Sequence, residues 1–150
     1  MEDRMKVIKK LLKGAAETES LGLEIASKAQ PNWVIALRGD LGAGKTTLTK
    51  AIAKGLGIKE TVTSPTFTVV CEYKSGRLPL YHFDVYRVSD SEELFEIGFD
   101  EYLAKGGICV IEWADLLEEG MLPEDTIYID LRYGASEEER VCELRYPCSF

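Results

Sequence analysis

The sequence lacks long hydrophobic runs: none of its 150 residues belongs to a stretch near the roughly 18 uninterrupted apolar residues that a membrane span needs. Its N-terminal segment has no long apolar core and no small-residue cleavage site, so we do not expect a secretory signal. Histidine occurs once, at position 82, and no two cysteines have the C-x₂₋₄-C spacing of a zinc site. We therefore expect reduced thiols, three of them in strand-like runs, in a cytoplasmic protein. The cysteines are Cys71, Cys109, Cys142 and Cys148.

Basic residues are scarce in the second half of the chain. Residues 84–143 contain 18 acids and 4 bases, whereas residues 1–83 contain 8 acids and 13 bases, and the net charge is −8. This distribution argues against a broad nucleic-acid groove, because phosphate binding needs clustered Lys and Arg. The acidic half is then either a solvated surface or a docking surface for a basic partner.

What is present is an ordinary globular composition, with 45% apolar and 29% charged residues and no linker or internal repeat. We expect one domain over residues 1–150. Apolar spacing predicts a helix at 18–29, and the run WVIALR predicts a buried strand at 33–38. A glycine cluster and a second helix follow.

The remaining elements predict a mixed sheet. Residues 66–73 and 78–85 are rich in β-branched and aromatic residues and predict a hairpin. Ser89 followed by Glu92 indicates a capping box. The apolar run 108–111 predicts a second buried strand, and residues 126–133 and 140–146 predict a terminal hairpin. The first fifteen residues are compatible with either a strand or a helix. The fold class is therefore α/β, a P-loop NTPase-like three-layer domain with a mixed, partly parallel β-sheet flanked by helices.

The strongest motif is GDLGAGKTT at 39–47, which fits G-x-x-x-x-G-K-[ST]. Glycines let consecutive backbone N–H groups curl around a polyphosphate, and the following helix directs its N-terminus at the phosphates. Lys45 would reach the β- and γ-phosphates, and the Thr46 hydroxyl would bind Mg²⁺. The motif follows a predicted buried strand and opens a predicted helix, which is the context it requires.

A phosphate loop also needs a carboxylate for magnesium, and ligands collect at the carboxyl ends of parallel strands. Glu112 ends the more uniformly apolar run, so we place it beside Thr46. Asp84 ends LPLYHF and would orient the attacking water or a metal-bound water. Arg87 could reach either phosphate or a structural acid.

The absence of certain motifs narrows the choice of nucleotide. The only asparagine is Asn32, which excludes an N-K-x-D guanine motif, and no D-x-x-G occurs. The sequence favours ATP over GTP. The arginines are scattered, without the Arg-rich lid of many small-molecule kinases.

The motif series as a whole resembles the TsaE family of bacterial ATPases in tRNA threonylcarbamoyladenosine biosynthesis. The series is the glycine loop, TSPTF at 63–67, YHFDVYR at 81–87, EELFEIGFDEYL at 92–103 and IEWAD at 111–115. The resemblance runs from about Thr18 to Arg140. It implies ATP or ADP with Mg²⁺ as ligands and a weak ATPase that partners stimulate.

The resemblance also implies roles for individual residues. Thr46 and Glu112 would coordinate Mg²⁺, and Asp84 and Lys45 would serve hydrolysis. Thr66, with Ser64, would belong to a segment that senses the nucleotide. The nucleotide itself would contact a larger set. These residues are Thr18, Leu41, Gly42, Ala43, Gly44, Lys45, Thr46, Thr47, Trp113 and Arg140.

The partners implied are the TsaD and TsaB proteins, with tRNA reached only through their complex, and neither DNA nor a membrane involved. Two other functions share the phosphate loop. A small-molecule kinase would need a phosphate acceptor, and a nucleotide-gated binding module would bind without turnover.

Overall fold

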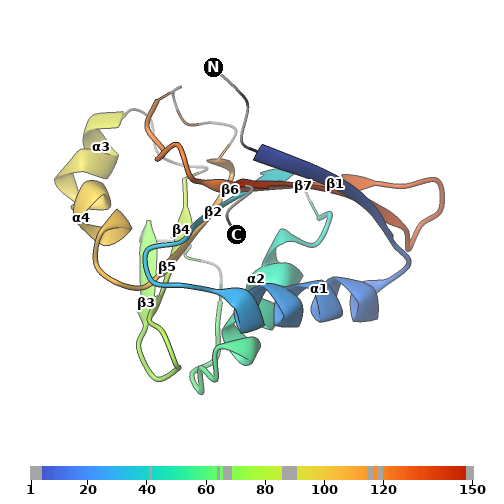
Figure 1. Ribbon diagram of the computed structural model, residues 1–150, viewed down its shortest axis with the longest axis horizontal. Coiled ribbons are helices and arrows are strands. Elements are labelled where there is room, and N and C mark those ends of the chain that lie inside the picture. Colours follow the sequence, from blue (N-terminus) through green and yellow to red (C-terminus); the bar gives the residue numbers. More distant parts are fainter. Residues whose placement is uncertain are drawn as a thin grey trace.

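The computed structural model describes residues 5–40, 42–63, 65, 69–85, 91–114, 117 and 120–147. Strands and helices alternate through the first half, and the chain ends in two strands (Figure 1). The elements are β1 Met5–Leu12, α1 Ala15–Lys28, β2 Val34–Gly39, α2 Lys45–Gly55, β3 Val70–Tyr73, β4 Leu80–Asp84, α3 Ser91–Glu96, α4 Phe99–Leu103, β5 Ile108–Glu112, β6 Ile127–Tyr133 and β7 Arg140–Pro147.

The strands of the described chain form one mixed sheet in the order β1-β7-β6-β2-β5-β4-β3. The four central strands, β6, β2, β5 and β4, are parallel to their neighbours in this group. The strands at either side, β3 next to β4 and β7 with β1 next to β6, run antiparallel. The carboxyl ends of β2, β4, β5 and β6 therefore meet at one edge, where α/β sheets bind ligands.

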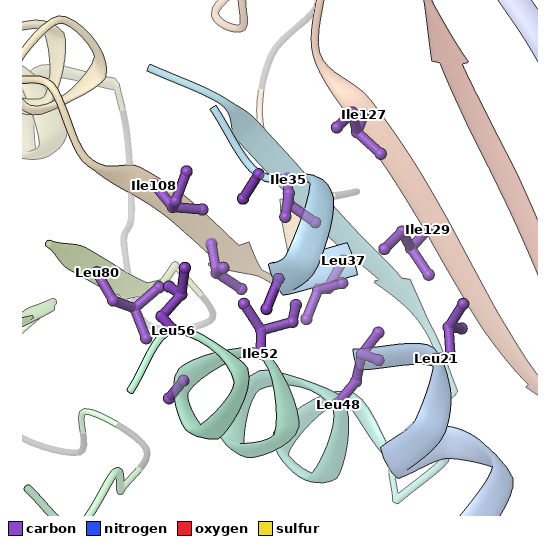
Figure 2. Close-up of a cluster of buried hydrophobic side chains, with 14 of the residues drawn as sticks. Leu21, Ile35, Leu37, Leu48, Ile52, Leu56, Leu80, Ile108, Ile127 and Ile129 are labelled. Atoms are coloured by element: carbon purple, nitrogen blue, oxygen red, sulfur yellow. The ribbon is translucent and has the colours of Figure 1, made fainter. Parts of the chain in front are cut away.

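Helices α1 and α2 cover one face of the sheet, and their apolar side chains build the larger core (Figure 2). Leu48, Ile52 and Leu56 follow one another at helical spacing and pack against the inward residues of the strands. The strand residues facing these helices alternate along each strand, as in Ile35 and Leu37 of β2. This packing fixes α2, and with it the loop that precedes it, over the end of β2.

The opposite face of the sheet is covered by the short helices α3 and α4. Phe83 of β4 packs edge-on against Phe99 and Tyr102 of α4, with ring centroids 5.2 and 5.4 Å apart. Leu94 of α3 belongs to the same buried cluster. Helices thus lie on both faces, which confirms the predicted three-layer α/β fold.

The predicted elements agree with the structure in kind, with boundary shifts of a few residues. The helix expected at 18–29 begins earlier, at Ala15, and the hairpin strand expected from 66 begins at Val70, with 66–68 outside the described residues. Ser89 of the predicted capping box also lies outside them. The ambiguous N-terminal segment is an edge strand: β1 pairs along its whole length with β7, from Met5 opposite Pro147 to Leu12 opposite Arg140.

The three described cysteines, Cys71, Cys109 and Cys142, are free thiols, as expected. Burial raises the pKa of Cys109 to about 12, and burial is also the main reason that the pKa of Cys142 rises to about 11. Both are core side chains in the protonated form. The described residues contain no cluster of three or more His, Cys, Asp or Glu side chains able to hold a metal ion.

Candidate active site

The glycine loop leaves the carboxyl end of β2 and enters α2, as its motif requires. Gly39 has φ 133°, and a Cβ there would overlap the backbone carbonyl of Leu131 on β6. Gly44, with φ 109°, lies in the left-handed region as the N-cap of α2. Both positions need glycine, one for close approach and one for conformation. The result is a tight turn at the N-terminus of a helix, which is the site of positive potential in the helix dipole.

Lys45, the first residue of α2, is folded into this loop. Its side chain is almost fully buried, with 5% of the residue exposed. The Nζ donates to the carbonyl oxygens of Gly39 at 3.1 Å and Asp40 at 3.0 Å, and it lies 4.1 Å from the centre of the Trp113 ring. A buried ammonium group is costly unless it is partnered. These contacts hold the positive charge inside the loop, where a polyphosphate would bring its negative charge.

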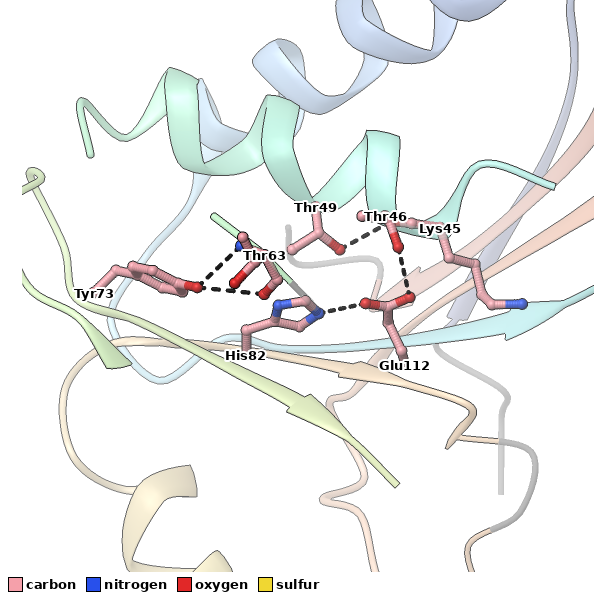
Figure 3. A network of polar contacts seen from close by, with 7 residues as sticks. All are labelled: Lys45, Thr46, Thr49, Thr63, Tyr73, His82 and Glu112. Atoms are coloured by element: carbon pink, nitrogen blue, oxygen red, sulfur yellow. Dashed lines mark hydrogen bonds and ion pairs between the residues drawn. The ribbon is translucent and has the colours of Figure 1, made fainter. Parts of the chain in front are cut away.

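Thr46 and Glu112 meet across two elements, the N-terminus of α2 and the end of β5. The Thr46 hydroxyl donates to Oε1 of Glu112 at 3.3 Å (Figure 3). Glu112 is 4% exposed, and its second oxygen, Oε2, contacts Nε2 of His82 on β4. The structure thus brings together the two residues expected to ligate Mg²⁺. His82, whose role the sequence analysis did not find, completes the cluster.

Asp84 lies at the end of β4, directly opposite Glu112 of β5 in the parallel register. Its backbone N–H donates to the carbonyl of Val69 at 3.0 Å, and the next amide, of Val85, donates to the carbonyl of Glu112 at 3.3 Å. The side chains of paired residues point to the same face of a parallel sheet, so both carboxylates lie on the face covered by α2. Asp84 is half-buried at the same sheet edge as the loop.

Trp113 follows Glu112 directly and adopts φ 63°, an uncommon value for a bulky residue. This conformation places the indole ring beneath the Lys45 ammonium group. The half-buried ring is therefore part of the loop's surroundings.

Thr18 of α1 is also at the loop. It is buried, and its Cγ2 lies 3.9 Å from the position that a Cβ on Gly44 would occupy. The Thr18 hydroxyl donates to the Gly14 carbonyl at 3.5 Å. The close packing of α1 on α2 accounts for this placement, which brings a residue from before β2 to the glycine loop.

Arg140 lies against Tyr133, a residue beside the loop that the sequence analysis missed. Its guanidinium lies 4.9 Å from the centre of the Tyr133 ring, and it donates to the carbonyls of Glu137 and Glu139. The Tyr133 hydroxyl in turn lies 3.0 Å from where a Cβ on Gly42 would stand. Tyr133 therefore lines the outer side of the loop.

The other predicted site residues lie in the loop, on the first turn of α2 or outside the described residues. Ala43 is buried in the loop and Thr47 is exposed on the first turn of α2. Leu41 and Thr66, together with Ser64 and Arg87, lie outside the described residues.

The donor set fits a magnesium nucleotide. Mg²⁺ prefers oxygen ligands and binds through one or two protein groups plus phosphate oxygens and water. A buried carboxylate oxygen within hydrogen-bond distance of a threonine hydroxyl, at the N-terminus of a helix beside a glycine loop, supplies such ligands. Two nitrogens or thiolates, as a zinc site would need, do not occur together in the described cluster.

Most of the chain is similar to proteins described as TsaE. The family model "Threonylcarbamoyl adenosine biosynthesis protein TsaE" matches residues 12–142. The tRNA threonylcarbamoyladenosine biosynthesis protein TsaE of Bacillus subtilis is 45% identical over 137 residues, covering 91% of this chain and 85% of the relative. The Treponema pallidum protein of the same name is 44% identical over 120 residues, or 80% and 87% of the two chains.

A solved structure has the same fold. The crystal structure of Bacillus subtilis YdiB superposes with a TM-score of 0.81 at 40% identity, over 97% of this chain and 89% of that chain. No helix in the described ranges combines the length and the apolar character that crossing a membrane would require.

Proposed function

Because the chain belongs to the TsaE family of tRNA threonylcarbamoyladenosine biosynthesis, we propose that it binds ATP with Mg²⁺ and hydrolyses the ATP in that pathway. The observation that carries this proposal is the convergence of Lys45, Thr46 and Glu112 at the glycine loop. Each of the three supplies a group that a magnesium polyphosphate needs, Lys45 and Thr46 from the start of α2 and Glu112 from the end of β5.

Different residues bind different parts of the magnesium nucleotide. The loop amides and the N-terminus of α2 face the phosphates, and Lys45 exchanges its loop carbonyls for phosphate oxygens. Thr46 and Glu112 hold Mg²⁺, which when bound neutralises charge on the phosphates. Trp113, beneath the Lys45 ammonium group, keeps water from one side of that charge.

Asp84 is the residue assigned to turnover. It stands beside Glu112 on the neighbouring strand and keeps partial access to solvent. A carboxylate in this position accepts a hydrogen bond from water and orients it toward the phosphate end of the nucleotide. Thr66 is assigned to the same step from the family resemblance.

The partners are proposed to be TsaD and TsaB in the cytoplasm, with tRNA reached through their complex. The charge distribution supports a protein partner over direct capture of tRNA, since residues 84–143 contain 18 acids against 4 bases. Hydrolysis is then weak in the free protein and stimulated by the complex.

The binding step is tested by calorimetric titration with Mg–ATP, comparing Lys45→Ala with Lys50→Ala. Both lysines are on α2, but Lys50 is exposed on its surface and serves as the matched control. Loss of one or two charge-assisted hydrogen bonds predicts a fall in affinity of about 10- to 100-fold for Lys45→Ala. Equal affinity of the two variants would refute the assignment of the loop.

The turnover step is tested by phosphate release, measured alone and with TsaD and TsaB added. Asp84→Asn is expected to bind Mg–ATP as the wild type does and to lose stimulated hydrolysis. Normal turnover in this variant would refute the role of Asp84. Binding by the wild type without turnover in either condition would instead favour a nucleotide-gated binding module.

A further inference from the structure

His82 is a buried ionisable side chain with one partner and one unused nitrogen. The residue is 0% exposed, its Nε2 contacts Oε2 of Glu112, and its Nδ1 has no hydrogen-bond partner in the part of the chain that is described. Buried polar atoms are nearly always partnered. Within the described residues, the contact with Glu112 is thus the one side-chain hydrogen bond that holds the buried imidazole.

The contacts favour one position for the proton of the ring. A carboxylate accepts hydrogen bonds and does not donate them, so the nitrogen that meets Glu112 is the donor. A proton on Nδ1 would leave a buried N–H donor unpaired, whereas a bare Nδ1 leaves only an acceptor lone pair. A ring with its proton on Nε2 satisfies these contacts best.

We propose that His82 is a positioning residue that holds the Glu112 carboxylate in its ligating orientation. Each carboxylate oxygen has its own partner: Oε2 receives the His82 N–H, and Oε1 faces the Thr46 hydroxyl at 3.3 Å (Figure 3). With Oε2 anchored, rotation about the end of the side chain is blocked and Oε1 stays directed at the metal position. This inference rests on the proposed binding of a magnesium nucleotide.

The strand register explains why His82 acts only through Glu112. His82 and Asp84 are two residues apart on β4 and therefore face the same side of the sheet. Asp84 is opposite Glu112 at the strand ends, whereas His82 is opposite Val110, one step farther into the core. His82 is fully buried there, so it contacts the carboxylate from within the core and is not accessible to nucleotide or solvent.

Three substitutions separate this role from simple packing. His82→Gln retains an N–H donor at about the reach of Nε2, His82→Asn has a donor that is too short, and His82→Leu fills the site without a donor. The test is the Mg²⁺ concentration dependence of ADP binding by each variant, with ADP binding in EDTA as the metal-free reference. Removing such an outer partner is expected to weaken the apparent Mg²⁺ affinity about 10- to 100-fold, while metal-free ADP binding is unchanged.

The apparent Mg²⁺ affinity is expected to be highest in the wild type and slightly lower in His82→Gln. It is expected to be clearly weaker in both His82→Asn and His82→Leu. Val110→Ala, a buried change on the adjacent strand, is the control for loss of core packing and is expected to keep wild-type Mg²⁺ dependence. Wild-type Mg²⁺ dependence in His82→Leu would overturn the inference. A wild-type protein whose ADP binding does not depend on Mg²⁺ would overturn the proposed function itself, and the two failures are thereby distinguished.

A second measurement needs no variant. His82 is the only histidine of the chain, so protein labelled with ¹⁵N-histidine shows the signals of one ring. We expect Nε2 to be protonated in the metal-free protein and its signal to shift when Mg–ADP is added. A ring with an unprotonated Nε2 could not donate to Glu112, and that result would refute the proposal.

Discussion

The contact between α1 and α2 offers a quantitative test of how tightly α2, which follows the glycine loop, is packed. A Cβ added to Gly55, the last residue of α2, would lie 2.5 Å from the Cβ of Ala26 on α1. Its next neighbours, both atoms of Leu23, would be at ordinary contact distances of 3.4 and 3.5 Å. The steric conflict at Gly55 is therefore with the single methyl group of Ala26, which is fully buried.

The expected free energies follow from that geometry. Gly55→Ala is expected to lower stability by about 1–2 kcal/mol, since overpacking costs about 1–3 and alanine regains up to about 1 in a helix. Ala26→Gly is expected to cost about 2 kcal/mol, from roughly 1 of helix propensity and roughly 0.8 for one buried methyl group. In the double variant the methyl group has only moved from one helix to the other, so stability is expected within about 0.5 kcal/mol of the wild type.

The assay is urea unfolding of the four proteins with a common slope, which yields the free energies of unfolding directly. Independent effects would sum to a loss of about 3–4 kcal/mol in the double variant, so the expected coupling is about 3 kcal/mol. A double variant whose loss equals the sum of the single losses would refute the reasoning, because the two methyl groups would then not compete for the same space.

Three further predictions concern the loop, the thiols and a tyrosine. Gly39→Ala is expected to cost at least about 1–3 kcal/mol of stability in urea unfolding, because alanine is strained at φ 133° and its methyl group would overlap the Leu131 carbonyl. Alkylation at pH 8 followed by peptide mass spectrometry is expected to modify half-buried Cys71 and spare Cys109, whose pKa is raised to about 12 by burial. The pKa of Tyr102 is also raised to about 12, chiefly by its hydrogen bond to a glutamate, so its contribution to stability is complete below pH 10 and lost between about pH 10 and 12. Tyr102→Phe should abolish that part of the decline in urea unfolding.

Each of these has a result that would contradict it. Gly106 has φ 92° and open space around it, so Gly106→Ala measures strain without overlap, and an equal loss in the two glycine variants would rule out the overlap. Alkylation of Cys109 at the rate of Cys71 in folded protein would mean that the core opens. An unchanged decline above pH 10 in Tyr102→Phe would assign that decline to other groups, since Glu72 accepts the hydrogen bond only while Tyr102 keeps its proton.

The parts of the site that could be predicted are those that local sequence patterns determine. The glycine spacing required a turn between a buried strand and a helix, and that is how β2, the loop and α2 are arranged. Glu112 could be assigned to Thr46 because both stand at element ends that a parallel sheet brings to one edge. The first strand could not be recognised, since its lysine-rich sequence lacks alternation and its pairing with β7 is a tertiary contact.

The contacts that were missed depend on register. His82 meets Glu112 only because β4 and β5 are neighbours with Asp84 opposite Glu112. A signal was available, since a residue two positions before a site carboxylate in a strand shares its face. Tyr133 reaches Gly42 because β6 lies next to β2, and no pattern within either strand indicates that adjacency.

The pairing of β1 with β7 has a consequence for the order of folding during synthesis. Met5 and Pro147 are partners in the sheet although 142 positions separate them, whereas β2 needs only β5 and β6 to be placed. β1 therefore leaves the ribosome long before β7 is synthesised, and the edge of β1 stays unpaired until then. Val7 and Leu11 of β1 are exposed even in the complete sheet. The glycine loop, Thr46 and Glu112 can thus come together on the nascent chain before the last β-ladder closes.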